Sequence, residues 1–119
     1  MKVVILTGRR ESLEDFVRGL GVDIDWAEEA TDVLNRAGAG NWGGVVVDAM
    51  TPGMDYKAFL MDLLRVNAML NTVVITDMGE DAFHEDSEGL GVLCAVPAMP
   101  TSEHGEQVVT RLRRISGLV

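Results

Sequence analysis

The sequence predicts a single α/β domain in which helices cover both faces of a five-stranded parallel sheet. Five short apolar runs alternate with five segments of helical periodicity along the 119 residues, and the runs are continuously apolar rather than alternating. Continuous apolar strands are typical of a parallel sheet buried between two helical layers, and parallel strands need helical crossovers. We therefore expect residues 1–119 to form one doubly wound (βα)5 domain with three α/β/α layers.

The first strand–helix unit combines the apolar run Val3–Leu6 with a helix from Ser12 to Leu20. Apolar residues at positions 13, 16, 17 and 20 have the i, i+3, i+4, i+7 spacing of one helical face. Ser12 followed by Asp15 resembles a capping box at the start of this helix. Gly19 and Gly21 favour its termination.

The second and third units repeat this pattern. Residues 22–26 form the second predicted strand, and the apolar positions 30, 33, 34 and 37 predict the helix that follows it. Residues 45–48 form the third strand, which is the clearest. A Pro-Gly turn at 52–53 then precedes a helix whose apolar positions are 59, 60, 63 and 64.

The last two strand–helix units differ in how clearly their apolar patterns predict a helix. Residues 73–75 predict the fourth strand, and the acidic segment 77–88 after it has few apolar positions, so we expect the weakest helix there. Residues 92–96 predict the fifth strand. The chain then passes Pro97 and Pro100 into a final helix with apolar positions 108, 109, 112 and 115.

Composition and charge argue against several classes of protein. Nineteen acidic residues against ten basic ones give a net charge of -9, which opposes binding to nucleic acid or to an anionic membrane surface. The apolar runs are too short to cross a bilayer, and the N-terminus lacks the pattern of a secretory signal, so we expect a cytoplasmic protein. Cys94 is the only cysteine and is expected to be a small core residue. His84, His104 and Cys94 lack the spacing of a metal site.

Several polar residues follow the predicted strands directly. In doubly wound sheets, ligands and chemistry lie just beyond the carboxyl ends of the strands. Asp48 ends the third strand, Thr7 and Gly8 follow the first, and Thr76 follows the fourth. Taken alone, an aspartate before a Pro-Gly turn is equally explained as a turn residue whose carboxylate accepts backbone N–H bonds.

The stretch VVVDAMTPGMD, residues 45–55, resembles the third strand and following loop of response-regulator receiver domains, which have a flavodoxin-like fold. The order of elements, Thr76 and the prolines after the fifth strand fit the same family, so the resemblance covers essentially the whole chain. It implies that Asp48 lies in the phosphoacceptor slot and Thr76 in the phosphoryl-sensing slot of two-component signal transduction. It also implies that Asp48 and the backbone carbonyl of Met50 would be the ligands of any divalent cation.

Four positions depart from the receiver pattern. Thr7 and Gly8 fill the slots of the acidic pair that holds the cation, Val96 fills the slot of the lysine, and Leu93 fills the slot of the aromatic residue. Magnesium held by one protein carboxylate, a carbonyl and water would bind weakly, so we expect no resident cofactor. The resemblance therefore implies an atypical receiver with impaired phosphoryl transfer.

Two arginines follow the missing acidic pair. One hypothesis is that Arg9 or Arg10 pairs with Asp48 and replaces the metal with a permanent cation. The alternative is that both side chains are solvated.

The functional interpretation is a receiver-like signalling module that acts by protein–protein interaction and is not an enzyme. A histidine kinase or a downstream signalling protein is the expected partner, whereas the oligomeric state is left open. In active relatives, partners dock mainly on the fourth helix, fifth strand and fifth helix, or near the first helix. The acidic segment 77–88 would dominate the first of these surfaces here, although a solvated face also explains its charges. Two alternatives remain, a conventional phosphoacceptor in a phosphorelay that is modified on Asp48, and a small flavodoxin-like binder of a phosphate or cofactor at Thr7–Ser12.

Overall fold

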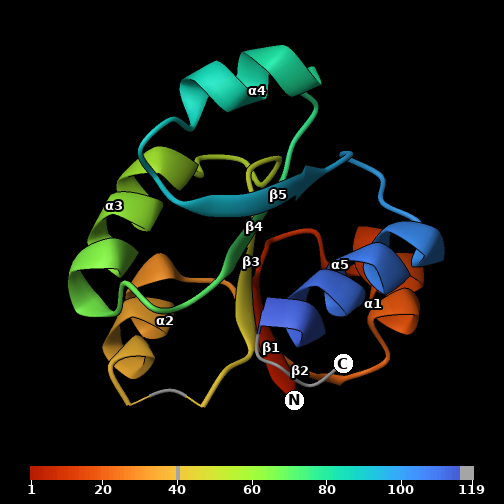
Figure 1. Cartoon of the computed structure of the whole chain (residues 1–119), viewed down its shortest axis with the longest axis horizontal. Coiled ribbons are helices and arrows are strands. Elements are labelled where there is room, and N and C mark those ends of the chain that lie inside the picture. The colour runs from red at the N-terminus through yellow and green to blue at the C-terminus, as the bar shows by residue number, and fades with distance from the viewer. Residues whose placement is uncertain (40, 116–119) are drawn as a thin grey trace.

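Strands and helices alternate along the chain as the sequence predicts (Figure 1). The computed structural model describes residues 1–39 and 41–115. The strands are β1 (Lys2–Leu6), β2 (Asp23–Ala27), β3 (Gly44–Asp48), β4 (Thr72–Ile75) and β5 (Val92–Val96). The helices are α1 (Glu14–Leu20), α2 (Ala30–Ala37), α3 (Tyr56–Val66), α4 (Glu80–Asp86) and α5 (Ser102–Ile115).

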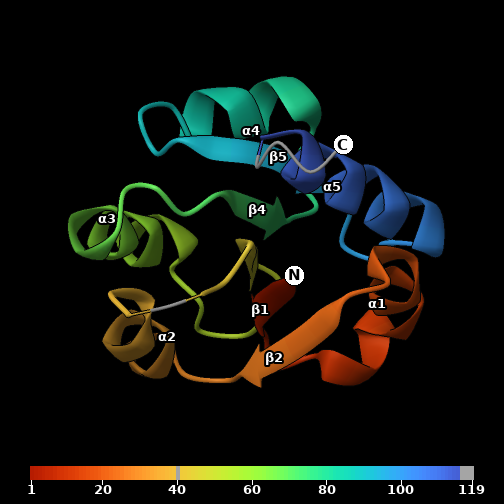
Figure 2. The same ribbon diagram turned by 60° about the horizontal axis from the view of Figure 1, so that its bottom comes forward.

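The five strands form one parallel sheet in the order β2-β1-β3-β4-β5. The chain therefore winds outward from β1 to β2 and then in the opposite direction through β3, β4 and β5, which makes the sheet doubly wound. Helices α1 and α5 lie on one face, and α2 and α3 lie on the other (Figure 2). The fold class and the (βα)5 order predicted from the sequence are confirmed.

Two hydrophobic cores explain why the central strand β3 is apolar along most of its length. Val46 of the central strand β3 packs with Phe16 and Leu112 from α1 and α5, whereas its neighbours Val45 and Val47 pack with α2 and α3 on the opposite face. Successive strand residues point to opposite faces, and both faces are covered, so every position along β3 is buried.

Helices α1 and α5 approach each other closely at two glycines. A Cβ atom added to Gly105 would lie 2.2 Å from the carbonyl oxygen of Phe16, and one added to Gly19 would lie 1.9 Å from the carbonyl oxygen of Ser102. Gly19 is therefore a packing residue inside α1 and does not end that helix. Gly21 ends it, with φ at 61° and its N–H bonded to the Val17 carbonyl at 3.2 Å.

The predicted capping box is wrong. The chain first forms a 3-10 turn, η1 (Arg10–Leu13), in which the N–H of Ser12 bonds to the carbonyl of Arg9 at 2.9 Å. Ser12 therefore lies within the helical stretch, and α1 has no side-chain cap at its start. The Asp15 carboxylate accepts a bond from Arg18 on the same helix instead, at 2.8 Å.

Three smaller expectations are also resolved. Helix α4 has seven residues and contributes Phe83 alone to the buried core, in line with its weak apolar pattern. Ile115, the last apolar position of α5, is 54% exposed and does not join the core. Cys94 is only partly buried, because β5 is an edge strand.

None of the helices in the described residues is long and apolar enough to cross a membrane.

Candidate functional site

Asp48 and Thr7 meet at the carboxyl edge of the sheet. Val47 on β3 is paired with Leu6 on β1, so Asp48, the last residue of β3, lies beside Thr7, the first residue after β1. Asp48 is fully buried, and the Thr7 hydroxyl donates to its Oδ2 at 2.7 Å. The Thr7 hydroxyl also accepts a bond from the backbone N–H of Arg9 at 2.8 Å, which fixes the turn that follows β1.

The Arg9 side chain binds the Asp48 carboxylate through two hydrogen bonds. Its Nε donates to Oδ2 and its Nη2 donates to Oδ1, each at 2.9 Å. This bidentate geometry is the strongest form of an arginine–carboxylate pair. Nη2 also donates to the carbonyl oxygen of Ala98 at 3.0 Å, so the guanidinium joins the ends of β1 and β3 to the loop after β5.

The carboxylate of Asp48 has no acceptor position left. Besides Arg9 and Thr7, the backbone N–H of Met50 donates to Oδ1 at 3.0 Å, so each oxygen accepts two bonds. An ionised carboxylate offers about four lone-pair sites. All of them point at protein donors. Met50 contributes its N–H here, and not the carbonyl that the receiver resemblance assigns to a cation.

Arg9, and not Arg10, is thus the arginine that pairs with Asp48. The Arg10 guanidinium lies over the ring of Trp26, 4.5 Å from its centroid. The two side chains diverge because they leave an irregular turn, where consecutive residues point in different directions. The hypothesis of a permanent cation at Asp48 agrees with this geometry for Arg9 alone.

The turn after β1 is also bound to the loop after β3. The N–H of Gly8 donates to the Thr51 hydroxyl at 3.1 Å, and the N–H of Thr51 donates to the backbone carbonyl of Asp48 at 3.1 Å. In the segment Thr7–Ser12, the N–H groups of Gly8, Arg9 and Ser12 are therefore used within the protein. Little of the anion-binding capacity of this turn is left for the phosphate of a cofactor.

The remaining receiver slots do not join the Asp48 cluster. The Thr76 hydroxyl is buried and accepts a bond from the N–H of Met78 at 3.2 Å, without a direct bond to Asp48. Val96, in the lysine slot, is 6% exposed and packs in the core beneath α5. Leu93, in the aromatic slot, is partly buried against the same core. Both side chains serve apolar packing.

The donor set around Asp48 does not fit a divalent cation. Such ions need several oxygen ligands, usually more than one carboxylate. Among residues 1–39 and 41–115, no group of three histidine, cysteine, aspartate or glutamate side chains could hold a metal ion. A guanidinium already stands against both oxygens of Asp48. His104 has a separate role, because its Nδ1 bonds with the N–H of Thr101 at 3.0 Å.

A second polar cluster links α3 to α4. The Tyr56 hydroxyl donates a hydrogen bond to the Asp86 carboxylate, which also accepts from Lys57 at 3.1 Å. The Tyr56 ring stacks with Phe83, with 5.9 Å between the ring centroids. Burial and the bond to Asp86 raise the pKa of Tyr56, and the bond from Tyr56 together with Lys57 lowers the pKa of Asp86. One charge of the acidic segment is thus used to hold α4 in place.

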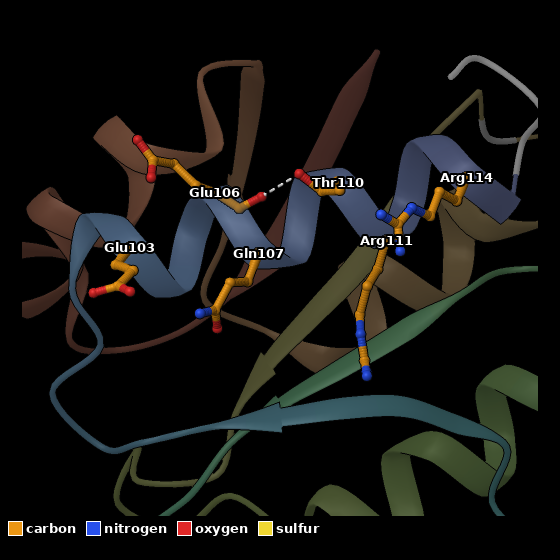
Figure 3. Close-up of a pocket in the computed structure, with 6 residues that line it drawn as sticks. All are labelled: Glu103, Glu106, Gln107, Thr110, Arg111 and Arg114. Atoms are coloured by element: carbon orange, nitrogen blue, oxygen red, sulfur yellow. Dashed lines mark hydrogen bonds between the residues drawn. The ribbon is translucent and has the colours of Figure 1, made fainter.

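The exposed side of α5 carries a shallow depression of about 410 Å³, shown in Figure 3. Glu103 and Glu106 lie toward the start of the helix, and Arg111 and Arg114 lie toward its end. Because both signs of charge occur there, this surface shows no preference for a ligand of one charge.

Comparisons with known proteins identify the fold through structure alone. No protein-family model and no curated protein sequence matches this chain. The receiver domain of a response regulator from Francisella has a TM-score of 0.80 at 15% identity, over 97% of this chain and 98% of that one. A receiver domain from Methanospirillum hungatei has a TM-score of 0.78 at 13% identity, over 98% and 96% of the two chains.

One further structure with this fold contains a metal ion. The receiver domain of a sensor histidine kinase from Pseudomonas aeruginosa has a TM-score of 0.75 at 12% identity, over 98% of this chain and 97% of that one. That protein has a magnesium ion coordinated in its active-site cleft. This chain therefore has the receiver-domain fold over nearly its full length. Its own Arg9–Asp48 pair lies at the carboxyl edge of the sheet.

Proposed function

We propose that this protein is a receiver-like signalling module that works by binding another protein, with Asp48 held in an unphosphorylated state by Arg9. The observation that carries the proposal is the saturated carboxylate of Asp48, which accepts four hydrogen bonds, two of them from Arg9. In this interpretation the guanidinium is a permanent counter-ion at the position where an active receiver uses an exchangeable cation.

Phosphoryl transfer to Asp48 would need changes that the site resists. A carboxylate oxygen must attack the phosphorus with a free lone pair, and a cation must offset the charge between the two anionic groups. Every lone pair of Asp48 is engaged, two of them by the Arg9 guanidinium. To admit a phosphoryl donor, Arg9 would have to leave a fully buried carboxylate without its counter-ion.

The residues around Asp48 also lack replacements for the missing chemistry. Thr7 donates a hydroxyl to Asp48 and has no carboxylate, Gly8 has no side chain, and Val96 is an apolar core residue. We therefore assign these positions to holding the fold and the ion pair. A protein partner, such as a histidine kinase or a downstream signalling protein, fits the net charge of -9 better than nucleic acid does.

The decisive experiment is a phosphorylation assay with a small-molecule donor. The protein is incubated with acetyl phosphate and magnesium beside an active receiver, and intact-mass spectrometry is used to look for a phosphoryl adduct. We expect full conversion of the active receiver and no adduct on this protein. An adduct that disappears in Asp48→Asn would defeat the proposal and support the conventional phosphoacceptor instead.

A further inference from the structure

A groove runs between α2 and α3 on the face of the sheet opposite α1 and α5. Figures 1 and 2 both show these two helices side by side, and the loop between β3 and α3 closes one end of the groove. Its volume is about 400 Å³, within the range of about 300–1,000 Å³ that is usual for clefts that bind small ligands and side chains.

The floor of the groove is apolar. Leu34 from α2, Met54 from the loop after β3 and Phe59 from α3 line it, and all three also pack in the hydrophobic core below. Ala58 is exposed on the wall formed by α3, where its small side chain leaves the groove open. The groove can therefore accept an apolar side chain from outside.

The rim of the groove is negative throughout. Four carboxylates line it, from Glu28, Glu29, Asp55 and Asp62, and its lining contains no lysine or arginine. Asp55 caps the start of α3, where its carboxylate accepts the N–H of Ala58 at 3.1 Å. Asp62 has only a long, exposed contact of 3.4 Å with Arg65.

Glu28 and Glu29 have no ion-pair partner among the described residues. The charge of this rim is thus largely uncompensated. The depression on α5 differs, because its acidic and basic residues balance (Figure 3). An apolar floor beneath an uncompensated negative rim is complementary to a cationic segment with an apolar anchor.

We propose that this groove docks a basic segment of a partner protein, in which an apolar side chain is flanked by lysine or arginine. The apolar side chain enters between Leu34 and Met54, and the flanking cations meet the four carboxylates of the rim. The inference rests on the proposed function for the existence of a protein partner, and it names the chemistry of that partner.

The groove is continuous with the Asp48 site through one loop. Thr51 lines the groove and also accepts the bond from Gly8 beside the Arg9–Asp48 pair. A docked segment would therefore contact the loop that holds Asp48, without any need to phosphorylate it.

The test is a titration of ¹⁵N-labelled protein, without any phosphoryl donor, with a short synthetic peptide. The peptide has two leucines one helical turn apart, flanked by lysines. We expect saturable amide shifts confined to residues 28–34 and 51–62. Three control probes separate the contributions, namely the peptide with serines for leucines, the peptide with glutamates for lysines, and spermine. We expect each control to bind at least about tenfold more weakly, because it lacks the anchor or the charge.

Paired variants test the location. Ala58→Arg fills the groove and should weaken peptide binding by more than about tenfold. Met61→Arg, at an exposed position of the same helix that is not among the lining residues, should leave binding within about twofold. Glu28→Gln with Asp62→Asn should weaken binding by about fivefold. A double change of equal charge on α5, Glu103→Gln with Glu106→Gln, should leave it within about twofold.

The proposal fails if the two members of each pair behave alike, since binding would then follow net charge alone. It also fails if spermine binds as tightly as the peptide, or if the shifts map to α4 and α5. A phosphoryl adduct on Asp48 would refute the proposed function without affecting these titrations, so the two failures are distinguishable.

Discussion

Replacement of Arg9 by alanine should destabilise the protein far more than the same change one residue later. Asp48 is fully buried, and Arg9→Ala removes two of its four hydrogen bonds together with the one ion-pair partner that it has among the described residues. Loss of one partner of a buried pair costs roughly 3–5 kcal/mol. The Arg9 side chain is 20% exposed, so water reaches part of the vacated space, and we expect the lower end, about 3 kcal/mol.

Urea unfolding followed by circular dichroism measures this change. With an m-value of about 1.5 kcal/mol/M, a loss of about 3 kcal/mol lowers the unfolding midpoint by about 2 M. Arg10→Ala removes the same charge but only an exposed contact with Trp26, worth about 0.5–1 kcal/mol, so its midpoint should fall by less than about 0.7 M.

A double-mutant cycle with Asp48→Ala separates the ion pair from other effects. When both partners are absent, no buried charge is left unpaired. The double variant should therefore lose less stability than the two single variants lose together, by at least about 1 kcal/mol. Equal midpoint shifts for Arg9→Ala and Arg10→Ala, or a coupling near zero, would refute the role assigned to Arg9.

Three further expectations concern other parts of the molecule. Gly105→Ala should lower the free energy of unfolding by roughly 1–3 kcal/mol or more, because the added methyl group forces α1 and α5 apart. Gly38→Ala should change it by less than about 1 kcal/mol in either direction, because Gly38 has a helical φ of -67° and ordinary contacts. Thermal unfolding compares the two variants. Tyr56 is the sole tyrosine, and its pKa is raised in the folded state, so the protein should lose stability as pH rises above about 10, a loss absent in Tyr56→Phe. Burial raises the pKa of the Cys94 thiol, so the midpoint of its alkylation rate against pH should lie above that of free cysteine.

The fold was predictable because its signals are local and repeated. The central strand β3 is a short run of three valines that is buried at every position, and α3 shows a helical period that needs no knowledge of distant residues. The signal is weaker in β2, which carries Asp23 and Asp25, and in α4, where Phe83 alone is buried. The place of Asp48 followed from the same reasoning, since a residue at the end of a central strand must reach the carboxyl edge of the sheet. The capping box failed because a local sequence pattern does not show where a preceding 3-10 turn places Ser12.

The contacts of the site were only partly predictable. The sequence offered Arg9 and Arg10 as equal candidates, and the choice between them depends on the irregular turn after β1 and on Trp26, which lies on another strand. The sequence presents Thr7 as a position without a carboxylate or as part of a phosphate-binding turn, whereas its hydroxyl is a direct partner of Asp48. The bond from Arg9 to the carbonyl of Ala98 involves a backbone group and has no signature in the sequence.

The Arg9–Asp48 pair also constrains how a signal can act on this protein under the proposed function. Phosphorylation would change a receiver by placing a group of charge near -2 where a carboxylate of charge -1 stood. Here the carboxylate is already paired with the guanidinium of Arg9, which belongs to the chain and cannot exchange as a bound ion can. A ligand shifts a conformational equilibrium only by its differential affinity for the two states. Regulation must then come from the partner itself, through its concentration and its contacts with the loop at Thr51.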